Sequence, residues 1–71
     1  MIKYRSIREE MFSDEIGSYI SYGIELTDGD NVVRKISDVS TDEETVSHLV
    51  LLSNELNLSP IHIDDVISDI L

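Results

Sequence analysis

The spacing of apolar residues changes once along this chain, near Ser40. Before this point apolar residues recur every second position, which is typical of β-strands with one buried face. After it they recur with a period of about 3.6 residues, which is typical of amphipathic helices. Strands followed by helices predict an α+β protein in two layers. The 71 residues suffice for one domain, spanning 1–71.

Residues 16–26 give the clearest strand pattern. Apolar residues alternate with mostly polar or small ones, so one face of this strand is predicted to be buried. The strand is followed by Asp28 and Gly29, a pair typical of a hairpin turn because both residues tolerate a positive φ. The apolar parity consists of Ile16, Ile20, Tyr22, Ile24 and Leu26, broken only by Ser18.

Two further strands are predicted, over 2–11 and 31–39. In the first, the apolar parity shifts between Tyr4 and Ile7, which predicts a β-bulge. In the second the parity is mixed and predicts no facing. Short connections favour a three-stranded antiparallel meander, whose two free edges are blunted by charge or pair with another copy. The charged residues of the first strand are Lys3, Arg5, Arg8, Glu9 and Glu10.

The first helix is predicted over 41–56. Two overlapping capping boxes mark its start, one formed by Ser40 with Glu43 and the other by Thr41 with Glu44. Acidic residues in this first turn also suit the positive end of the helix dipole. The apolar stripe consists of Val46, Leu49, Val50, Leu52 and Leu56, with Leu51 outside it.

The second helix is predicted over 60–70. Asn57 suits a left-handed cap, Ser59 an N-cap and Pro60 the first helical position. The short connection predicts a helical hairpin that packs on one face of the sheet, in the order β-β-β-α-α. The apolar face of this helix consists of Ile63, Val66, Ile67 and Ile70.

The net charge of −10 is the unusual feature of the composition. Residues 41–71 carry seven acidic residues and no lysine or arginine, a formal charge of −7. A field of this sign repels nucleic acid and anionic lipid and attracts a basic protein surface. We therefore expect neither direct nucleic-acid binding nor membrane binding. The alternative is that the charge only keeps a small protein soluble.

The composition also indicates the compartment. The chain has no cysteine, which fits a reducing environment. Charged residues interrupt the N-terminal region, so it does not resemble a secretory signal, and the longest apolar run, residues 49–52, is far too short to cross a bilayer. We expect a cytoplasmic protein.

Three polar residues of the second helix form the first candidate site: His62, Asp65 and Asp69. Spacings of three and four residues place them on one side of the helix, where an imidazole and two carboxylates can hold a divalent cation or act as acid and base. The alternative is that they flank the apolar stripe as ordinary surface residues. His48 of the first helix either completes a site with His62 or stands at the edge of the core.

Tyr19 lies on the polar parity of the middle strand, beside small residues. It marks either a binding surface or a cross-strand packing partner. The chain has no nucleophile elbow, phosphate-binding loop, dinucleotide fingerprint or zinc spacing. The second helix lacks the basic residues that a DNA-recognition helix needs. We therefore predict that the protein is not an enzyme, and we assign no catalytic, cofactor-binding or metal residues and no cofactor.

Three short segments together resemble a family of small bacterial proteins of unknown function. The resemblance would cover most of the chain and implies a bacterial cytoplasmic origin without an assigned activity. It supplies no site residues. The segments are Tyr22-Gly23-Ile24, Ile36-Ser37-Asp38-Val39-Ser40, and Leu58 with His62, Val66 and Asp69.

Four functions remain open. The leading hypothesis is a small acidic module that binds or regulates another protein through its acidic helical face or an open sheet edge. The alternatives are a nucleic-acid mimic that occupies a basic DNA-binding cleft, a metal-binding protein or enzyme using His62, Asp65 and Asp69, and a self-assembling structural subunit, for instance a homodimer.

Overall fold

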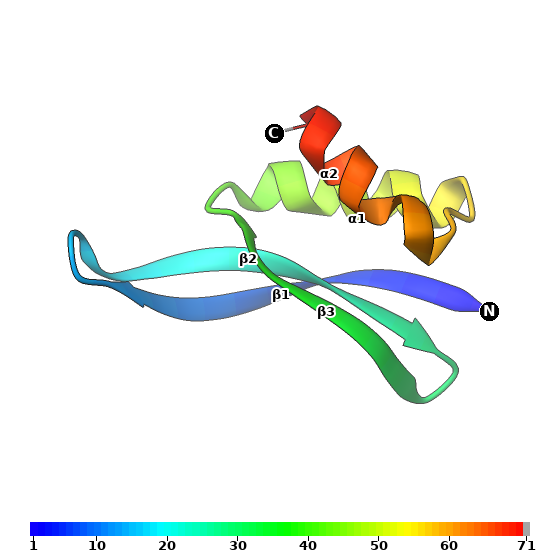
Figure 1. The fold of residues 1–71 in the computed structure, drawn as a ribbon, viewed down its shortest axis with the longest axis horizontal. Helices are drawn as coiled ribbons and strands as arrows, with labels where there is room; N and C mark the ends of the chain where they lie inside the picture. Colours follow the sequence, from blue (N-terminus) through cyan, green and yellow to red (C-terminus); the bar gives the residue numbers. More distant parts are fainter. Residues whose placement is uncertain (71) are drawn as a thin grey trace.

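The computed structural model describes residues 1–70, and its elements follow the predicted order (Figure 1). The three strands form one antiparallel sheet of order β1-β2-β3, and the two helices lie together on one side of it. This confirms the α+β fold with a meander followed by a helical pair. The elements are β1 (Ile2–Ser13), β2 (Gly17–Asp28), β3 (Asn31–Ser40), α1 (Glu43–Glu55), the 3₁₀ turn η1 (Pro60–His62) and α2 (Ile63–Ile70).

The pairing of β1 with β2 shows no register shift over the whole length of both strands. The bulge predicted in β1 is therefore wrong. Tyr4 faces the helices, whereas Ile7 and Met11 stand on the other side of the sheet, which we call the open face. The parity shift thus arises because both faces of β1 carry apolar residues, not because the strand slips.

The irregularities lie in the pairing of β2 with β3. Between the pairs Tyr22–Ser40 and Ile24–Ile36, three residues of β3 stand opposite one residue of β2. Asp38 lies in this bulge with a φ of 54°, in the left-handed region. These bulges explain why residues 31–39 have no consistent parity, since each one changes which side chains face the core.

Helix α1 begins with Asp42 as its N-cap. The Oδ1 atom of Asp42 accepts a hydrogen bond from the Glu44 backbone N–H at 3.1 Å, and its Oδ2 accepts one from the Thr45 hydroxyl at 2.8 Å. The hydroxyl oxygen of Ser40 instead accepts from the Asp42 backbone N–H at 3.0 Å. Both predicted capping boxes are therefore wrong, because a carboxylate one residue further along satisfies the free N–H groups.

The connection between the helices follows the prediction only in part. Asn57 has the expected left-handed conformation, with a φ of 48°. Ser59 precedes the turn but makes no side-chain cap bond, and Pro60 starts the 3₁₀ turn η1 rather than an α-helix. The single helix predicted over 60–70 is thus a 3₁₀ turn followed by α2.

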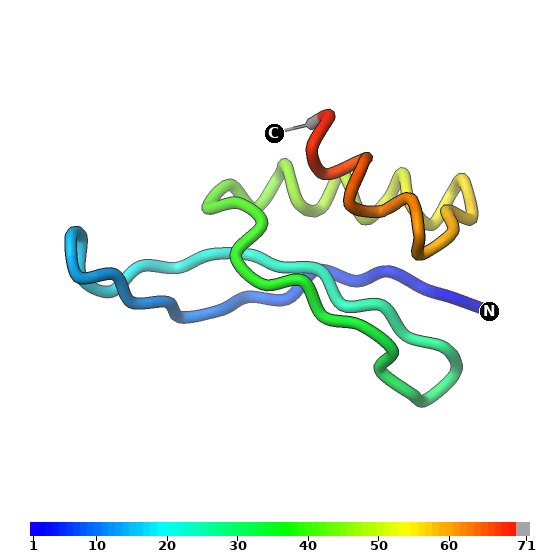
Figure 2. Tube along the Cα trace, viewed as in Figure 1, coloured from blue at the N-terminus to red at the C-terminus, as the bar shows by residue number. Residues whose placement is uncertain are grey.

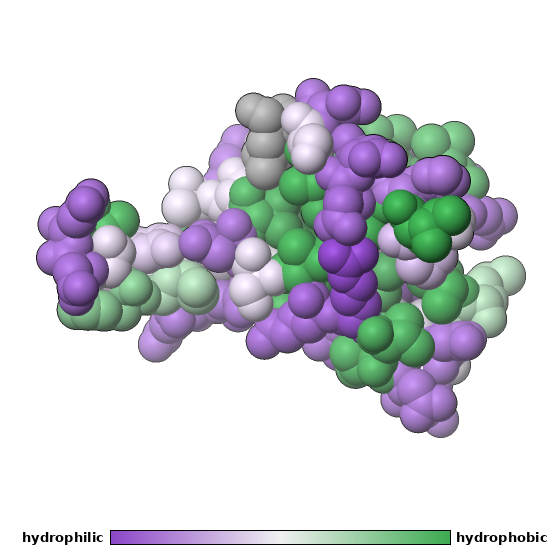
Figure 3. Space-filling view, viewed as in Figure 1, coloured by the Kyte–Doolittle hydropathy of each residue, from purple (hydrophilic) through white to green (hydrophobic). Residues whose placement is uncertain are grey.

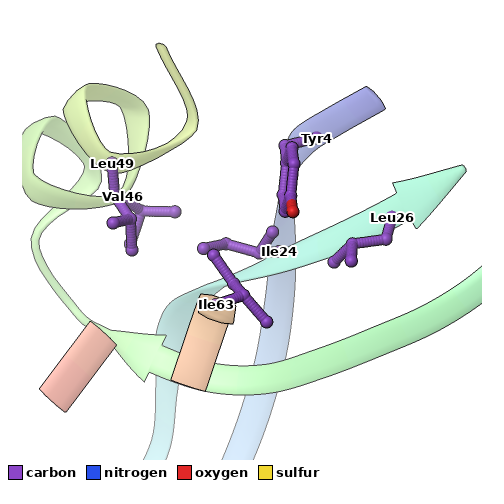
Figure 4. Close-up of a cluster of buried hydrophobic side chains, with 6 residues drawn as sticks. All are labelled: Tyr4, Ile24, Leu26, Val46, Leu49 and Ile63. Atoms are coloured by element: carbon purple, nitrogen blue, oxygen red, sulfur yellow. The ribbon is translucent and has the colours of Figure 1, made fainter. Parts of the chain in front are cut away.

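The core joins both layers of the protein (Figure 4). Its buried apolar side chains come from β1, β2, α1 and α2, so the second helix packs in the same cluster as the first strand. Leu56 and Ile16, predicted on apolar faces, are exposed, because the first is the C-cap of α1 and the second lies in the β1–β2 turn. The predicted core position of Ile70 lies outside the described side chains. The buried cluster consists of Tyr4, Ile24, Leu26, Val46, Leu49 and Ile63.

The β1–β2 hairpin extends well beyond the helices (Figures 1 and 2). We call this projecting part, residues 10–20, the arm. The arm has two strands only, because β3 ends opposite Tyr22. Phe12 and Ile16 are exposed on it. The sheet therefore has a covered end that forms the core and an uncovered end that reaches into solvent.

Candidate functional site

Helix α1 has two contrasting sides. Val46, Leu49 and Ser53 are buried against the sheet. The opposite side carries a line of exposed residues at spacings of three and four, which places them along one stripe of the helix. We call this line the outer stripe of α1. It consists of Glu44, His48, Leu51 and Glu55.

The acidic residues of the helical half are all exposed, and they are largely uncompensated. Among residues 1–70, only Asp64 of this group pairs with a base: both of its carboxylate oxygens accept hydrogen bonds from the Arg34 guanidinium, at 2.8 and 3.0 Å. The charge predicted for this half therefore lies on the surface. The acidic residues are Asp42, Glu43, Glu44, Glu55, Asp64, Asp65 and Asp69.

Large apolar side chains stand among these acids. Leu51 is 55% exposed, Leu56 71% and Ile61 77%. In the space-filling view, apolar surface lies between polar residues over the helical part of the molecule (Figure 3). A surface that combines exposed leucine or isoleucine with unpaired carboxylates suits a partner that offers both apolar and basic side chains.

The predicted metal residues do not come together as a site. His62, Asp65 and Asp69 are each exposed, and no group of three or more metal-binding side chains in the described part of the chain is arranged to hold an ion. His48 instead lines a shallow surface depression with Asp42, Glu44 and Leu52. The histidines therefore contribute to the surface of the helical layer, and His48 belongs to its outer stripe.

A polar cluster on the open face was not predicted. The Asp38 carboxylate accepts hydrogen bonds from the Ser21 hydroxyl at 2.5 Å and from the Tyr19 hydroxyl at 2.9 Å. The Asp38 backbone N–H donates to Oε1 of Glu9 at 3.1 Å, and Oε2 of Glu9 lies 3.6 Å from the Lys35 amine. The side chain of Glu9 thus reaches from β1 across β2 to the bulge of β3.

Gly23 makes this reach possible. A Cβ atom at Gly23 would lie 2.7 Å from Oε1 of Glu9 and 2.5 Å from the backbone oxygen of Ile36, both closer than packing allows. Gly23 lies on the polar parity of β2, opposite Ile7. A glycine inside a strand often marks a close approach of another group, so Gly23 is the sequence signal that could have indicated this crossing.

The chemistry of the cluster is structural. Hydrogen bonds from Ser21 and then from Tyr19 lower the pKa of Asp38, and the bond to Asp38 raises the pKa of Tyr19. The hydroxyl of Ser21 donates to the Asp38 carboxylate, and the residue is fully buried, so the hydroxyl is closed to a substrate. Tyr19 therefore acts as a cross-strand partner that holds the bulge of β3, which favours the second of its two predicted roles.

The fold and these surfaces define a small α+β protein with an acidic, partly apolar helical layer and an uncovered arm. Its sequence belongs to the Family of unknown function (DUF6514), which matches residues 1–71. Searches of curated proteins and of solved structures gave no match. Within residues 1–70, neither helix has the length and apolarity needed to cross a membrane.

Proposed function

We propose that this protein is a small binding module that recognises a basic, amphipathic segment of a partner protein through the outer stripe of α1. The stripe itself carries the proposal: an exposed Leu51 stands between two glutamates, two turns from Glu44 and one turn from Glu55. Neither carboxylate has a basic partner among residues 1–70. A structural helix needs no exposed leucine at this position.

The two parts of the stripe would contribute differently. Burial of the Leu51 side chain by a partner is worth about 1.5–3 kcal/mol at most, and it depends little on salt. The carboxylates act mainly on the association rate and on the choice of partner, and salt weakens their effect because a Debye length at physiological ionic strength is only about 8 Å. Binding should therefore weaken at high salt.

We propose binding rather than catalysis, because the one buried hydroxyl that bonds to a carboxylate within residues 1–70, that of Ser21, is closed to a substrate. The cysteine-free chain fits our proposal of a bacterial cytoplasmic setting. If the partner is a DNA-binding protein whose basic cleft takes up the acidic helices, duplex DNA will compete for the same site.

The test is affinity capture from a bacterial lysate at low salt, followed by mass spectrometry and by titration of the purified partner. Glu44→Gln/Glu55→Gln and Leu51→Ser should each lose the partner. Asp14→Asn/Glu15→Gln changes the charge by the same amount in the exposed β1–β2 turn and should retain it. Equal retention by both double variants, or no partner at all, would refute the proposal.

A further inference from the structure

The outer edge of β1 is blocked at one point by α1. The side-chain oxygen of Asn54 accepts a hydrogen bond from the Tyr4 backbone N–H at 2.9 Å, and its amide donates one to the Tyr4 carbonyl at 2.8 Å. Asn54 thus takes the place that a residue of a neighbouring strand would occupy. Both backbone groups of Tyr4 point away from β2.

The remaining edge can be deduced from this orientation. In an antiparallel pair, alternate residues direct both backbone groups outward, and β1 pairs with β2 without a shift. The same outward orientation therefore recurs at every second residue as far as the end of β1 at Ser13. No bond to another described residue covers these backbone groups beyond Tyr4. The outward residues are Ser6, Arg8, Glu10 and Phe12.

The unpaired part of the β1 edge, residues 6–12, has Glu9 at its midpoint. Two identical strands that pair antiparallel are related by a twofold axis, and an axis at Glu9 pairs the whole stretch. It places Ser6 opposite Phe12 and Arg8 opposite Glu10, each twice. The free edge is limited at one end by Asn54, which bonds to Tyr4, and at the other end by the β1–β2 turn. Only one antiparallel register therefore pairs the whole of it.

The side chains favour the same register. With the axis at Glu9, each Arg8 stands opposite a Glu10, and on the open face each Ile7 stands opposite a Met11. Opposite charges and apolar pairs in direct cross-strand positions are stabilising. An axis at Arg8 or at Glu10 would instead place that charged residue opposite its own copy.

We propose that two copies of this chain pair antiparallel along β1 about Glu9 and form one continuous six-stranded sheet, twice the three strands of each copy. The two Glu9 side chains do not meet at the axis. Each is only 13% exposed and extends inward over Gly23, where it accepts the Asp38 N–H and lies near Lys35.

The arrangement also accounts for Phe12. Its side chain points to the helical side of the sheet but lies beyond its own helices and is 71% exposed. In the dimer it stands opposite Ser6 of the second copy, two residues from that copy's Tyr4, where the helical layer begins. Each copy thus covers the exposed aromatic ring of the other.

The dimer is independent of the binding surface proposed above, because the outer stripe of α1 takes no part in it. Sedimentation equilibrium of the full chain at about 150 mM salt, where repulsion between the two acidic copies is screened beyond about 8 Å, measures its dissociation constant. Arg8→Glu and Glu10→Arg should each raise this constant at least about tenfold, because each places like charges in both pairs.

Mixing gives the decisive result. An equal mixture of the Arg8→Glu and Glu10→Arg chains restores opposite charges at both pairs, so it should form heterodimers although each variant alone is monomeric. Lys3→Glu changes the charge as Arg8→Glu does, but outside the paired stretch, and should remain dimeric. A monomeric wild-type chain at high micromolar concentration, or a dimer unaffected by Arg8→Glu, would overturn the proposal.

Discussion

The Ser21 hydroxyl donates a hydrogen bond of 2.5 Å to Asp38, a residue whose backbone is in the left-handed region. Non-glycine residues adopt this conformation at a cost, and aspartate tolerates it better than most. The bond fixes the bulge of β3 to β2 on the open face of the sheet. Ser21 and Asp38 therefore act as one unit, in which a side-chain contact stabilises an unfavourable backbone conformation.

This unit predicts a specific acid sensitivity. Because the folded pKa of Asp38 is lowered, its carboxylate adds stability above its ordinary pKa of 3.8, and this stability is lost as the pH falls through the lower, folded value. Urea denaturation across the acid range should show a shallower loss for Asp38→Asn than for wild type. Ser21→Ala, which removes the main donor, should act in the same direction. Parallel acid profiles for all three proteins would contradict this account.

The crossing of Glu9 over β2 predicts that Gly23 cannot accept a side chain. In Gly23→Ala the new methyl group meets the Ile36 backbone oxygen, which cannot move without disturbing the pairing of β2 with β3. We expect a loss of about 1–3 kcal/mol in the free energy of unfolding. Ser18→Ala, at an exposed site on the same strand, should change it by less than about 0.5 kcal/mol. Equal effects would show that Gly23 is not a close crossing point.

Two isoleucines that are two residues apart, one buried and one exposed, allow a controlled test of how α2 packs on the rest of the protein. Ile63 is fully buried, whereas Ile61 is 77% exposed. Ile63→Ala should lower the free energy of unfolding by about 2–5 kcal/mol, through lost burial and the cavity left behind. Ile61→Ala removes the same atoms and should have little effect. Thermal and chemical denaturation of both variants would measure the difference, and similar losses would mean that α2 packs differently.

The bonds between Asn54 and Tyr4 predict that a polar residue of α1 stabilises the sheet. Asn54→Ala leaves the N–H and the carbonyl of a residue that is 3% exposed without partners, which should cost about 1–3 kcal/mol. Ser47→Ala, on the exposed side of α1, is the control and should be nearly neutral. Denaturation curves that shift equally for both variants would argue against the two bonds.

The order of elements could be predicted from the sequence because apolar spacing reports directly on burial. The alternation that ends at Leu26 predicted the most buried part of β2, and the turn at Asp28-Gly29 was clear from residue type alone. The spacing of Ile63 with Val66 and Ile67 likewise predicted the packed face of α2.

Local geometry was harder to predict where several neighbouring residues can fill the same role. Ser40, Thr41 and Asp42 can each cap a helix, and only the path of the chain out of β3 decides that Asp42 does so. A bulge was predicted in β1, where none occurs, because sequence parity cannot distinguish a slipped strand from one with apolar residues on both faces.

The candidate sites show the same limit. The polar cluster joins Glu9, Ser21 and Asp38, which are far apart in sequence and meet only through strand pairing. No spacing rule links them. The outer stripe of α1, by contrast, follows from helical periodicity, and Leu51 was already set apart from the apolar stripe by sequence.

The unequal lengths of the sheet and its helical cover give the molecule two levels of local stability. Backbone amides of β2 near Ile24 lie beneath the core and should exchange with solvent deuterium only when the whole domain unfolds. In a single copy, those of the arm, with few buried contacts, should exchange through local fraying that leaves the core intact. The arm can therefore open and close while the rest of the protein stays folded, so it can adapt its shape without risk to the fold.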